Sequence, residues 1–164
     1  MQLLDLQSRI YVAALERSEK ETVKIKNIYV FSRFRFGCGM VKTSSGYKLL
    51  IAGGTSLKFG QSGAPIRSAH LYDLKTKRWS PAQSMPIPLL DMSSVQYGEN
   101  LLFVGGSTSE AHTNYNNKIF EYNGVTNTWR QWTKGLKAGR RGCGIMVIGG
   151  EGIKLLIAFW YFLL

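Results

Sequence analysis

The side chains best suited to chemistry in this 164-residue sequence are two histidines and two cysteines. His70 lies in a predicted strand and His112 in a polar loop, so we do not expect the two imidazoles to meet at a metal ion. Cys38 and Cys143 each stand in a Gly-Cys-Gly triplet within an apolar stretch. Two thiols are too few for a disulfide framework or a metal cluster, so we predict that both are buried and structural.

A glycine-rich stretch at residues 149–152 is the other candidate for chemistry, because glycine-rich loops can bind phosphate. The Lys-Ser/Thr pair that completes a phosphate-binding loop does not follow it, so a hairpin turn is the better interpretation. The sequence therefore predicts no catalytic residue, no metal ligand and no cofactor. We expect a protein that is not an enzyme.

Basic residues outnumber acidic ones, with 21 Lys and Arg against 10 Asp and Glu and a net charge of +11. Such a charge can indicate binding to nucleic acid or to an anionic membrane. Here the basic residues are spread along the chain, and the longest runs are the pairs Lys77-Arg78 and Arg140-Arg141. This pattern favours a solvated basic surface over a specific nucleic-acid or membrane partner.

The elements that would carry these side chains repeat along the sequence. Each copy has an apolar strand that ends in a glycine pair, then a polar loop, a strand with a tyrosine and a strand with a tryptophan. The glycine pairs begin 52 residues apart, and the tyrosines and the tryptophans are each 50 residues apart. The matched positions are Gly53, Gly54, Tyr72 and Trp79 in the first copy and Gly105, Gly106, Tyr122 and Trp129 in the second.

A further short apolar stretch precedes each copy, so each repeat offers four strands. No segment within residues 36–135 keeps apolar residues at the spacing of a full helix. Four short strands and a period near fifty are typical of a β-propeller blade. In such a blade the glycine pair permits a sharp turn, and the large aromatic rings press one sheet against the next.

These residues resemble the kelch repeat, in which a glycine pair ends the second strand, a tyrosine lies in the third and a tryptophan in the fourth. The resemblance covers about residues 35–148. It implies an all-β fold, a partial β-propeller of four-stranded antiparallel blades with two full blades and part of a third. The expected segments are an N-terminal segment at 1–34, a first blade at 35–86, a second at 87–139, the start of a third at 140–158 and an apolar tail at 159–164.

Both ends of the sequence depart from the repeat. Residues 154–158 repeat the apolar strand, but Phe159 and Trp160 follow where a glycine pair is needed, so we expect the tail to be foreign to the repeat, as in a truncated or differently spliced product. The ten apolar residues at 155–164 are fewer than the roughly twenty that span a bilayer. At the other end, the pattern favours a short helix through about Glu21 and a strand at 27–31, either the last strand of a preceding blade or an edge that closes a ring.

The kelch resemblance implies a module that binds a protein or peptide through loops at one end of the propeller. The loops at residues 55–68 and 107–117 carry groups that can hydrogen-bond or stack on a ligand. The candidate partner-binding residues are Lys58, Phe59, Arg67, His112 and Tyr115.

The family includes substrate receptors of cullin-type ubiquitin ligases and, among kelch-like propellers, copper-radical oxidases. A receptor of this kind uses a BTB domain of about a hundred residues, and only 34 residues precede the first repeat. An oxidase needs imidazole and tyrosinate ligands with a cysteine crosslinked to a tyrosine, and this sequence has two histidines. The resemblance therefore implies a non-catalytic interaction module, with an oxidase or a non-functional truncated product as the alternatives.

Two further expectations concern the cellular location of the chain and its self-association. Neither a signal peptide nor an Asn-x-Ser/Thr acceptor is present, so we expect a cytoplasmic location. Two blades and a fragment do not close a ring, so we expect self-association through the unclosed blade faces.

Overall fold

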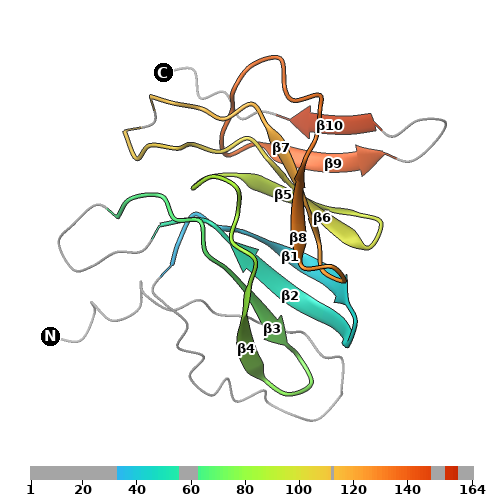
Figure 1. Cartoon of the computed structure of the whole chain (residues 1–164). Helices are drawn as coiled ribbons and strands as arrows, with labels where there is room; N and C mark the ends of the chain where they lie inside the picture. Colours follow the sequence, from blue (N-terminus) through green and yellow to red (C-terminus); the bar gives the residue numbers. More distant parts are fainter. Residues whose placement is uncertain (1–32, 56–62, 112, 149–153, 159–164) are drawn as a thin grey trace, which may run out of the picture.

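The computed structural model describes residues 33–55, 63–111, 113–148 and 154–158 of the chain. Within these ranges ten β-strands form two four-stranded antiparallel sheets and one two-stranded hairpin (Figure 1). No helix occurs in this part of the chain. The expected helix through Glu21 and the expected strand at 27–31 lie outside the described residues.

The first sheet, which we call blade 1, has its strands in chain order and confirms the predicted four-stranded pattern. Asp73 ends the third strand and accepts hydrogen bonds from the backbone N–H groups of Lys75 and Thr76, at 2.9 and 3.0 Å, which closes the turn into the fourth. The strands are β1 (Gly37–Thr43), β2 (Gly46–Ala52), β3 (Ala69–Asp73) and β4 (Arg78–Ala82).

The second sheet, blade 2, repeats this arrangement with different residues. Asn123 takes the place of Asp73 and accepts from the N–H groups of Val125 and Thr126, at 2.9 and 3.0 Å. A carboxylate and an amide oxygen build the same turn because both accept from the backbone two and three residues later. The strands are β5 (Ser93–Tyr97), β6 (Asn100–Val104), β7 (Ile119–Asn123) and β8 (Thr128–Gln131).

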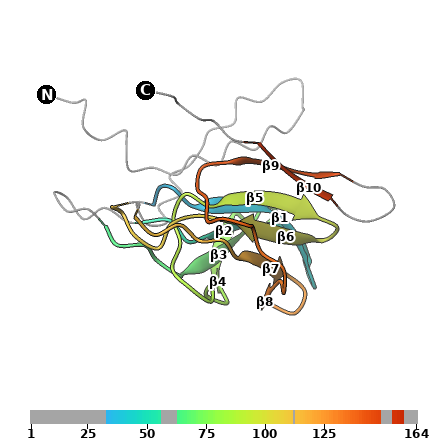
Figure 2. The same cartoon turned by 90° about the horizontal axis from the view of Figure 1, so that it is seen from above.

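A hairpin of β9 (Gly144–Ile148) and β10 (Lys154–Ala158) follows blade 2. Its register joins Gly144 to Ala158, as the register of blade 1 joins Gly37 to Ala52. The hairpin is therefore the first half of a third blade, as the sequence predicted. Figure 2 shows it beside β5, at the end of the stack of sheets.

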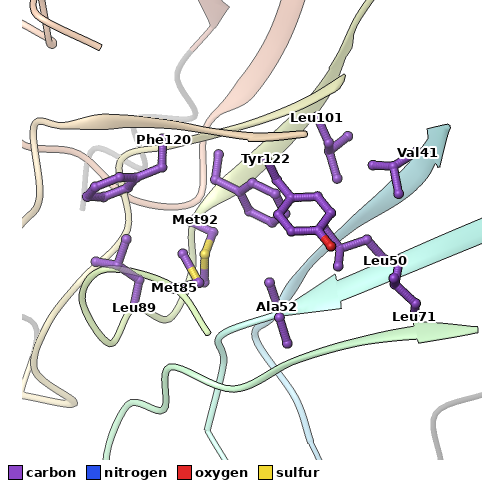
Figure 3. Packing of buried hydrophobic residues seen from close by; sticks show 12 residues of the cluster. Val41, Leu50, Ala52, Leu71, Met85, Leu89, Met92, Leu101, Phe120 and Tyr122 are labelled. Atoms are coloured by element: carbon purple, nitrogen blue, oxygen red, sulfur yellow. The ribbon is translucent and has the colours of Figure 1, made fainter. Parts of the chain in front are cut away.

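The main hydrophobic core fills the space between blade 1 and blade 2 (Figure 3). Side chains alternate along each strand, so Leu101 and Phe103 of β6 face blade 1, while Leu102 and Val104 face the hairpin. The smaller core between blade 2 and the hairpin also includes Ile145 of β9. Each large apolar side chain buried in these layers contributes about 1.5–3 kcal/mol to stability, which is what holds the blades together.

Backbone hydrogen bonds between blades recur with the same period as the sequence. Gly54 N–H donates to the Leu89 carbonyl at 2.7 Å, and Gly106 N–H donates to the Arg140 carbonyl at 2.6 Å. A Cβ on Gly105 would overlap the same Arg140 carbonyl oxygen. The glycine pairs therefore allow the close approach of the next chain segment that the sequence predicted.

The prediction that both thiols are buried is wrong for Cys38, which is exposed, whereas Cys143 is buried. Strand β1 begins at Gly37 and includes Cys38, but β9 begins at Gly144, after Cys143. The two Gly-Cys-Gly triplets therefore occupy different positions in the repeat. Gly37 and Gly39 face blade 2, so Cys38 between them faces the opposite side, where no described strand packs.

Candidate binding site at the loop end

The longer connections gather at one end of the blades and the tight turns at the other. Figure 1 shows the β2–β3 and β6–β7 connections on the left and the β1–β2 and β5–β6 turns on the right. The segments that lead into β5 and β9 run along the same left-hand end. We call this the loop end; its described residues are 33–36, 53–55, 63–68, 83–92, 105–111, 113–118 and 132–143.

The loops at this end are fixed by buried hydroxyl groups. Thr55 and Ser107, one in each repeat, are fully buried. The Thr55 hydroxyl donates to a Glu110 carboxylate oxygen at 3.2 Å, and the Ser107 hydroxyl donates to the carbonyls of Ser109 and Asn114 at 2.6 and 3.1 Å. Isolated β-bridges add to this at Phe34↔Thr55, Thr55↔Pro65, Leu90↔Ser107 and Ser107↔Tyr115. These contacts hold the described residues of the loop end in place.

Four side chains form a continuous array on this surface. Arg35 Nε donates to Asp91 Oδ1 at 2.7 Å, and Arg141 Nη1 lies 3.4 Å from Asp91 Oδ2. The Arg141 guanidinium also lies over the ring of Tyr115, 5.7 Å from its centroid, which is cation–π geometry. Tyr115 is 44% exposed. We call these four residues the arginine–tyrosine array.

The electrostatics of the array keep Asp91 ionised. Burial alone would raise the pKa of Asp91, but hydrogen bonds and charge from Arg35 and then Arg141 outweigh it, and the pKa is lowered. The same hydrogen bond to Asp91 is the main cause that raises the pKa of Arg35. Asp91 therefore anchors both arginines, and it holds Arg141 where it can contact a ligand together with Tyr115.

The repeat residues singled out in the sequence lie at matching places in the two blades. Each glycine pair follows the second strand directly, with positive φ at every one of the four glycines. The ring centroids of Tyr72 and Trp79 are 4.9 Å apart, and those of Tyr122 and Trp129 are 5.0 Å apart. The indole N–H of Trp129 donates to the Gln83 carbonyl of blade 1 at 2.7 Å. These residues are structural, and they position the loop end.

The structure gives the predicted loop residues different positions and contacts. Tyr115 is exposed and belongs to the array. Arg67 holds its loop in place, because its Nε donates to the Met85 carbonyl at 2.8 Å and the Met85 N–H donates back to its carbonyl at 2.8 Å. Lys58, Phe59 and His112 lie outside the described residues.

Sequence reasoning missed Arg35, Asp91 and Arg141, which occupy the connections just before the first strand of each blade. Arg35 and Asp91 hold equivalent places before β1 and β5: the Asp91 N–H donates to the Arg35 carbonyl, and the Gly142 N–H donates to the Asp91 carbonyl, both at 2.9 Å. Aligning the segments before each first strand would have placed charged residues together there.

A hollow of about 220 Å³ lies at the opposite end of blade 2. Glu121 in its wall is buried and accepts from Asn100 Nδ2 at 2.6 Å, Trp132 Nε1 at 2.8 Å and Arg130 Nη2 at 2.5 Å. These contacts satisfy the hydrogen-bonding capacity of the carboxylate. The hollow is therefore a weaker candidate for a binding site than the loop end.

Among the described residues no three His, Cys, Asp or Glu side chains come together in a group that could hold a metal ion. Within the same ranges no helix has the length and apolar character needed to cross a membrane.

Comparison with known proteins agrees with the blade arrangement. The family model described as the Kelch motif matches residues 37–86, which contain β1 to β4. The solved structure of YjhT matches with a TM-score of 0.57 and 13% sequence identity, over 69% of this chain and 40% of that one. The chain thus spans well under half of YjhT, and an identity this low shows the fold alone. None of the curated proteins matches the sequence significantly. Residues 37–86 match the Kelch motif, and the described sheets form a partial β-propeller.

Proposed function

We propose that the chain is a non-catalytic binding module that recognises a segment of another protein through its loop end. The kelch motif is typical of β-propellers that act as protein-interaction modules. The observation that carries the proposal is the exposed Tyr115 ring with the Arg141 guanidinium over it. Tyrosine and arginine are the residue types that dominate binding energy in protein interfaces.

The array suits a partner segment with a carboxylate beside an apolar or aromatic side chain. Arg141 is 39% exposed, and its 3.4 Å contact with Asp91 is long, so its other donors stay available to an incoming carboxylate. The ring of Tyr115 offers a flat apolar surface next to it. Because Thr55 and Ser107 hold the described loop residues beside the array, these residues need little backbone ordering on binding.

The finer role that the kelch resemblance implies, substrate recognition in ubiquitin ligation, stays a prediction. It would use the same loop end and would require a ligase-binding partner. The absence of catalytic activity stays a prediction as well.

The test is selection of peptides from a random 12-residue display library on the immobilised chain. The enriched peptides are then titrated against the wild type and against Tyr115→Ala and Arg141→Ala. Tyr47→Ala is the matched control, because Tyr47 is also exposed, at 56%, but lies in β2 near the tight turns. Circular dichroism shows whether each variant is folded.

We expect the two array variants to weaken peptide binding by at least about tenfold, as truncation of an interface hot spot does. Tyr47→Ala should leave binding unchanged. Equal effects of Tyr115→Ala and Tyr47→Ala, or no enrichment over a scrambled library, would show that the loop end is not the binding surface.

A further inference from the structure

Three exposed lysines extend the loop end beyond the arginine–tyrosine array. Lys118, Lys134 and Lys137 are all exposed, and none of them forms an ion pair with another described residue. The two segments that carry them, residues 113–118 and 132–143, contain no Asp or Glu. This surface is therefore positive with no acidic residue of its own, and we call the three lysines the lysine ridge.

Two chain segments that run side by side build the ridge. The Leu136 N–H donates to the Asn117 carbonyl at 2.7 Å, and the Arg140 N–H donates to the Asn116 carbonyl at 3.1 Å. Trp132 and Leu136 pack in the core between blade 2 and the hairpin. These bonds and this core hold the backbone beneath the ridge in place, so the lysines are displayed from an ordered segment.

The equivalent connection of blade 1 lacks this charge. The Met85 N–H donates to the Arg67 carbonyl at 2.8 Å, which matches the bond from Leu136 to Asn117. The blade 1 connection, residues 83–90, contains no charged side chain, although blade 2 packs against it. The lysines are therefore not needed for one blade to stack on the next.

Blade stacking also leaves the positions of these lysines open. The match of Met85 to Leu136 makes Gln83 the counterpart of Lys134 and Pro86 the counterpart of Lys137. Gln83 and Pro86 are exposed, whereas Met85 between them is fully buried in the core between the blades. Lys134 and Lys137 thus lie on a surface that a neighbouring blade does not cover.

The ridge begins directly beside the array. A Cβ on Gly139 would overlap the Tyr115 carbonyl oxygen, and Arg141 lies over the Tyr115 ring. Lys118 follows Tyr115 by three residues, so their Cα atoms are at most about 10 Å apart. An extended peptide advances about 3.3 Å per residue, so a peptide anchored at Arg141 reaches the ridge with a side chain about three or four positions away.

Carboxylates suit this surface better than a nucleic acid does. Proteins that bind single-stranded nucleic acids combine phosphate contacts along a groove with several aromatic rings on which bases stack. Among the described residues of the loop end, Tyr115 is the only exposed aromatic residue. One ring and a short row of lysines match a peptide with one anchor and a few acidic side chains.

We propose that the lysine ridge selects partner segments that carry acidic residues three or four positions from the carboxylate held by Arg141. The inference rests on the proposed function, and it names the partner class as an extended acidic segment of another protein. The lysines contribute charge complementarity, which salt screens because the ridge is exposed.

The first test repeats the peptide selection on the wild type, on a ridge variant and on a control variant. The ridge variant is Lys118→Gln with Lys134→Gln and Lys137→Gln. The control is Lys75→Gln with Lys77→Gln and Arg78→Gln, which removes the same charge from exposed positions at the β3–β4 turn. Peptides selected on the wild type and on the control should be enriched in acidic residues at the stated spacing, and those selected on the ridge variant should not.

The second test uses a fluorescent 12-residue peptide of alternating threonine and glutamate, with a threonine–glutamine peptide and a single-stranded 12-nucleotide oligothymidylate for comparison. Anisotropy at low salt should show that the acidic peptide binds most tightly. The ridge variant should weaken its binding about three- to tenfold, as loss of a few exposed charge pairs does. The control variant should leave it unchanged, and physiological salt should reduce the difference between wild type and ridge variant.

Three results would overturn the inference. These are equal effects of the ridge and control variants, tighter binding of the oligonucleotide than of the acidic peptide, and selected peptides without acidic enrichment. If selected peptides depend on Tyr115 and Arg141 but not on the ridge, the proposed function stands and this inference fails. If binding depends on neither set of residues, both fail.

Discussion

At the scale of single residues, Trp129 carries two separable contributions. Its ring packs against Phe103 and Tyr122 with centroids 5.0 Å away in both cases, and its indole N–H reaches the Gln83 carbonyl across the boundary between blades. Packing area and a single hydrogen bond differ in their expected energies, so substitution can tell them apart.

We predict that Trp129→Ala lowers the free energy of unfolding by about 3 kcal/mol through lost packing. Trp129→Phe, which keeps a ring and loses the N–H donor, should cost about 1 kcal/mol. Urea denaturation followed by circular dichroism measures both. Equal losses in the two variants would mean that the ring contributes nothing beyond its hydrogen bond.

Asp91 gives the loop end a pH dependence whose sign follows from its pKa. The folded-state pKa of Asp91 is lowered, so the unfolded chain binds the proton more readily. The stabilisation is therefore complete above the ordinary aspartate pKa of about 3.9 and is lost as the pH falls from there toward the folded-state value. Asp91→Asn should lack this component, and urea denaturation between pH 7 and pH 2.5 should show a flatter profile for it than for the wild type. Identical profiles would contradict the anchoring role of Asp91.

At the scale of elements, the glycines after the second strands differ from those in the tight turns. Gly105 and Gly98 both have positive φ, of 69° and 56°. A Cβ at Gly105 would overlap the Arg140 carbonyl that joins blade 2 to the next segment, whereas a Cβ at Gly98 would meet nothing within 4 Å.

The two substitutions to alanine should therefore separate backbone strain from steric overlap. Gly98→Ala should cost about 1 kcal/mol, because only the unfavourable φ is involved. Gly105→Ala should cost roughly 3 kcal/mol or more, since the segments must also move apart. Thermal melts of both variants measure the difference, and similar losses would show that close approach is not the reason for glycine at Gly105.

The sequence was sufficient to predict the strands and their grouping into blades, because glycine, tyrosine and tryptophan recur with a nearly constant period. It was misleading for Cys38, since two similar triplets lie at different positions relative to their strands. It did not reveal the arginine–tyrosine array, for a physical reason. Its members lie outside the recurring glycine, tyrosine and tryptophan positions, and their proximity follows from how the sheets stack. Of the five loop candidates, Tyr115 alone is now placed in the array.

At the scale of the whole molecule, the hairpin β9–β10 presents an apolar side that no described strand covers. Met146 and Ile148 are 57% and 42% exposed on the side of β9 opposite Ile145, which packs on blade 2. Val41, which holds the position in β1 that corresponds to Ile148 in β9, is fully buried against blade 2. Among the described strands, none packs against Met146 and Ile148 in the way that blade 2 packs against Val41.

The blades stack through one repeating contact, in which the first strand of a blade packs on the next blade. Light scattering coupled to size-exclusion chromatography tests this most directly. We predict that the wild-type chain at micromolar concentration shows a mass above one chain that rises with concentration. Met146→Glu combined with Ile148→Glu should shift it toward the mass of a single chain, because charged side chains oppose burial of that surface. A wild-type chain that is monomeric throughout and melts in one sharp transition would contradict the claim.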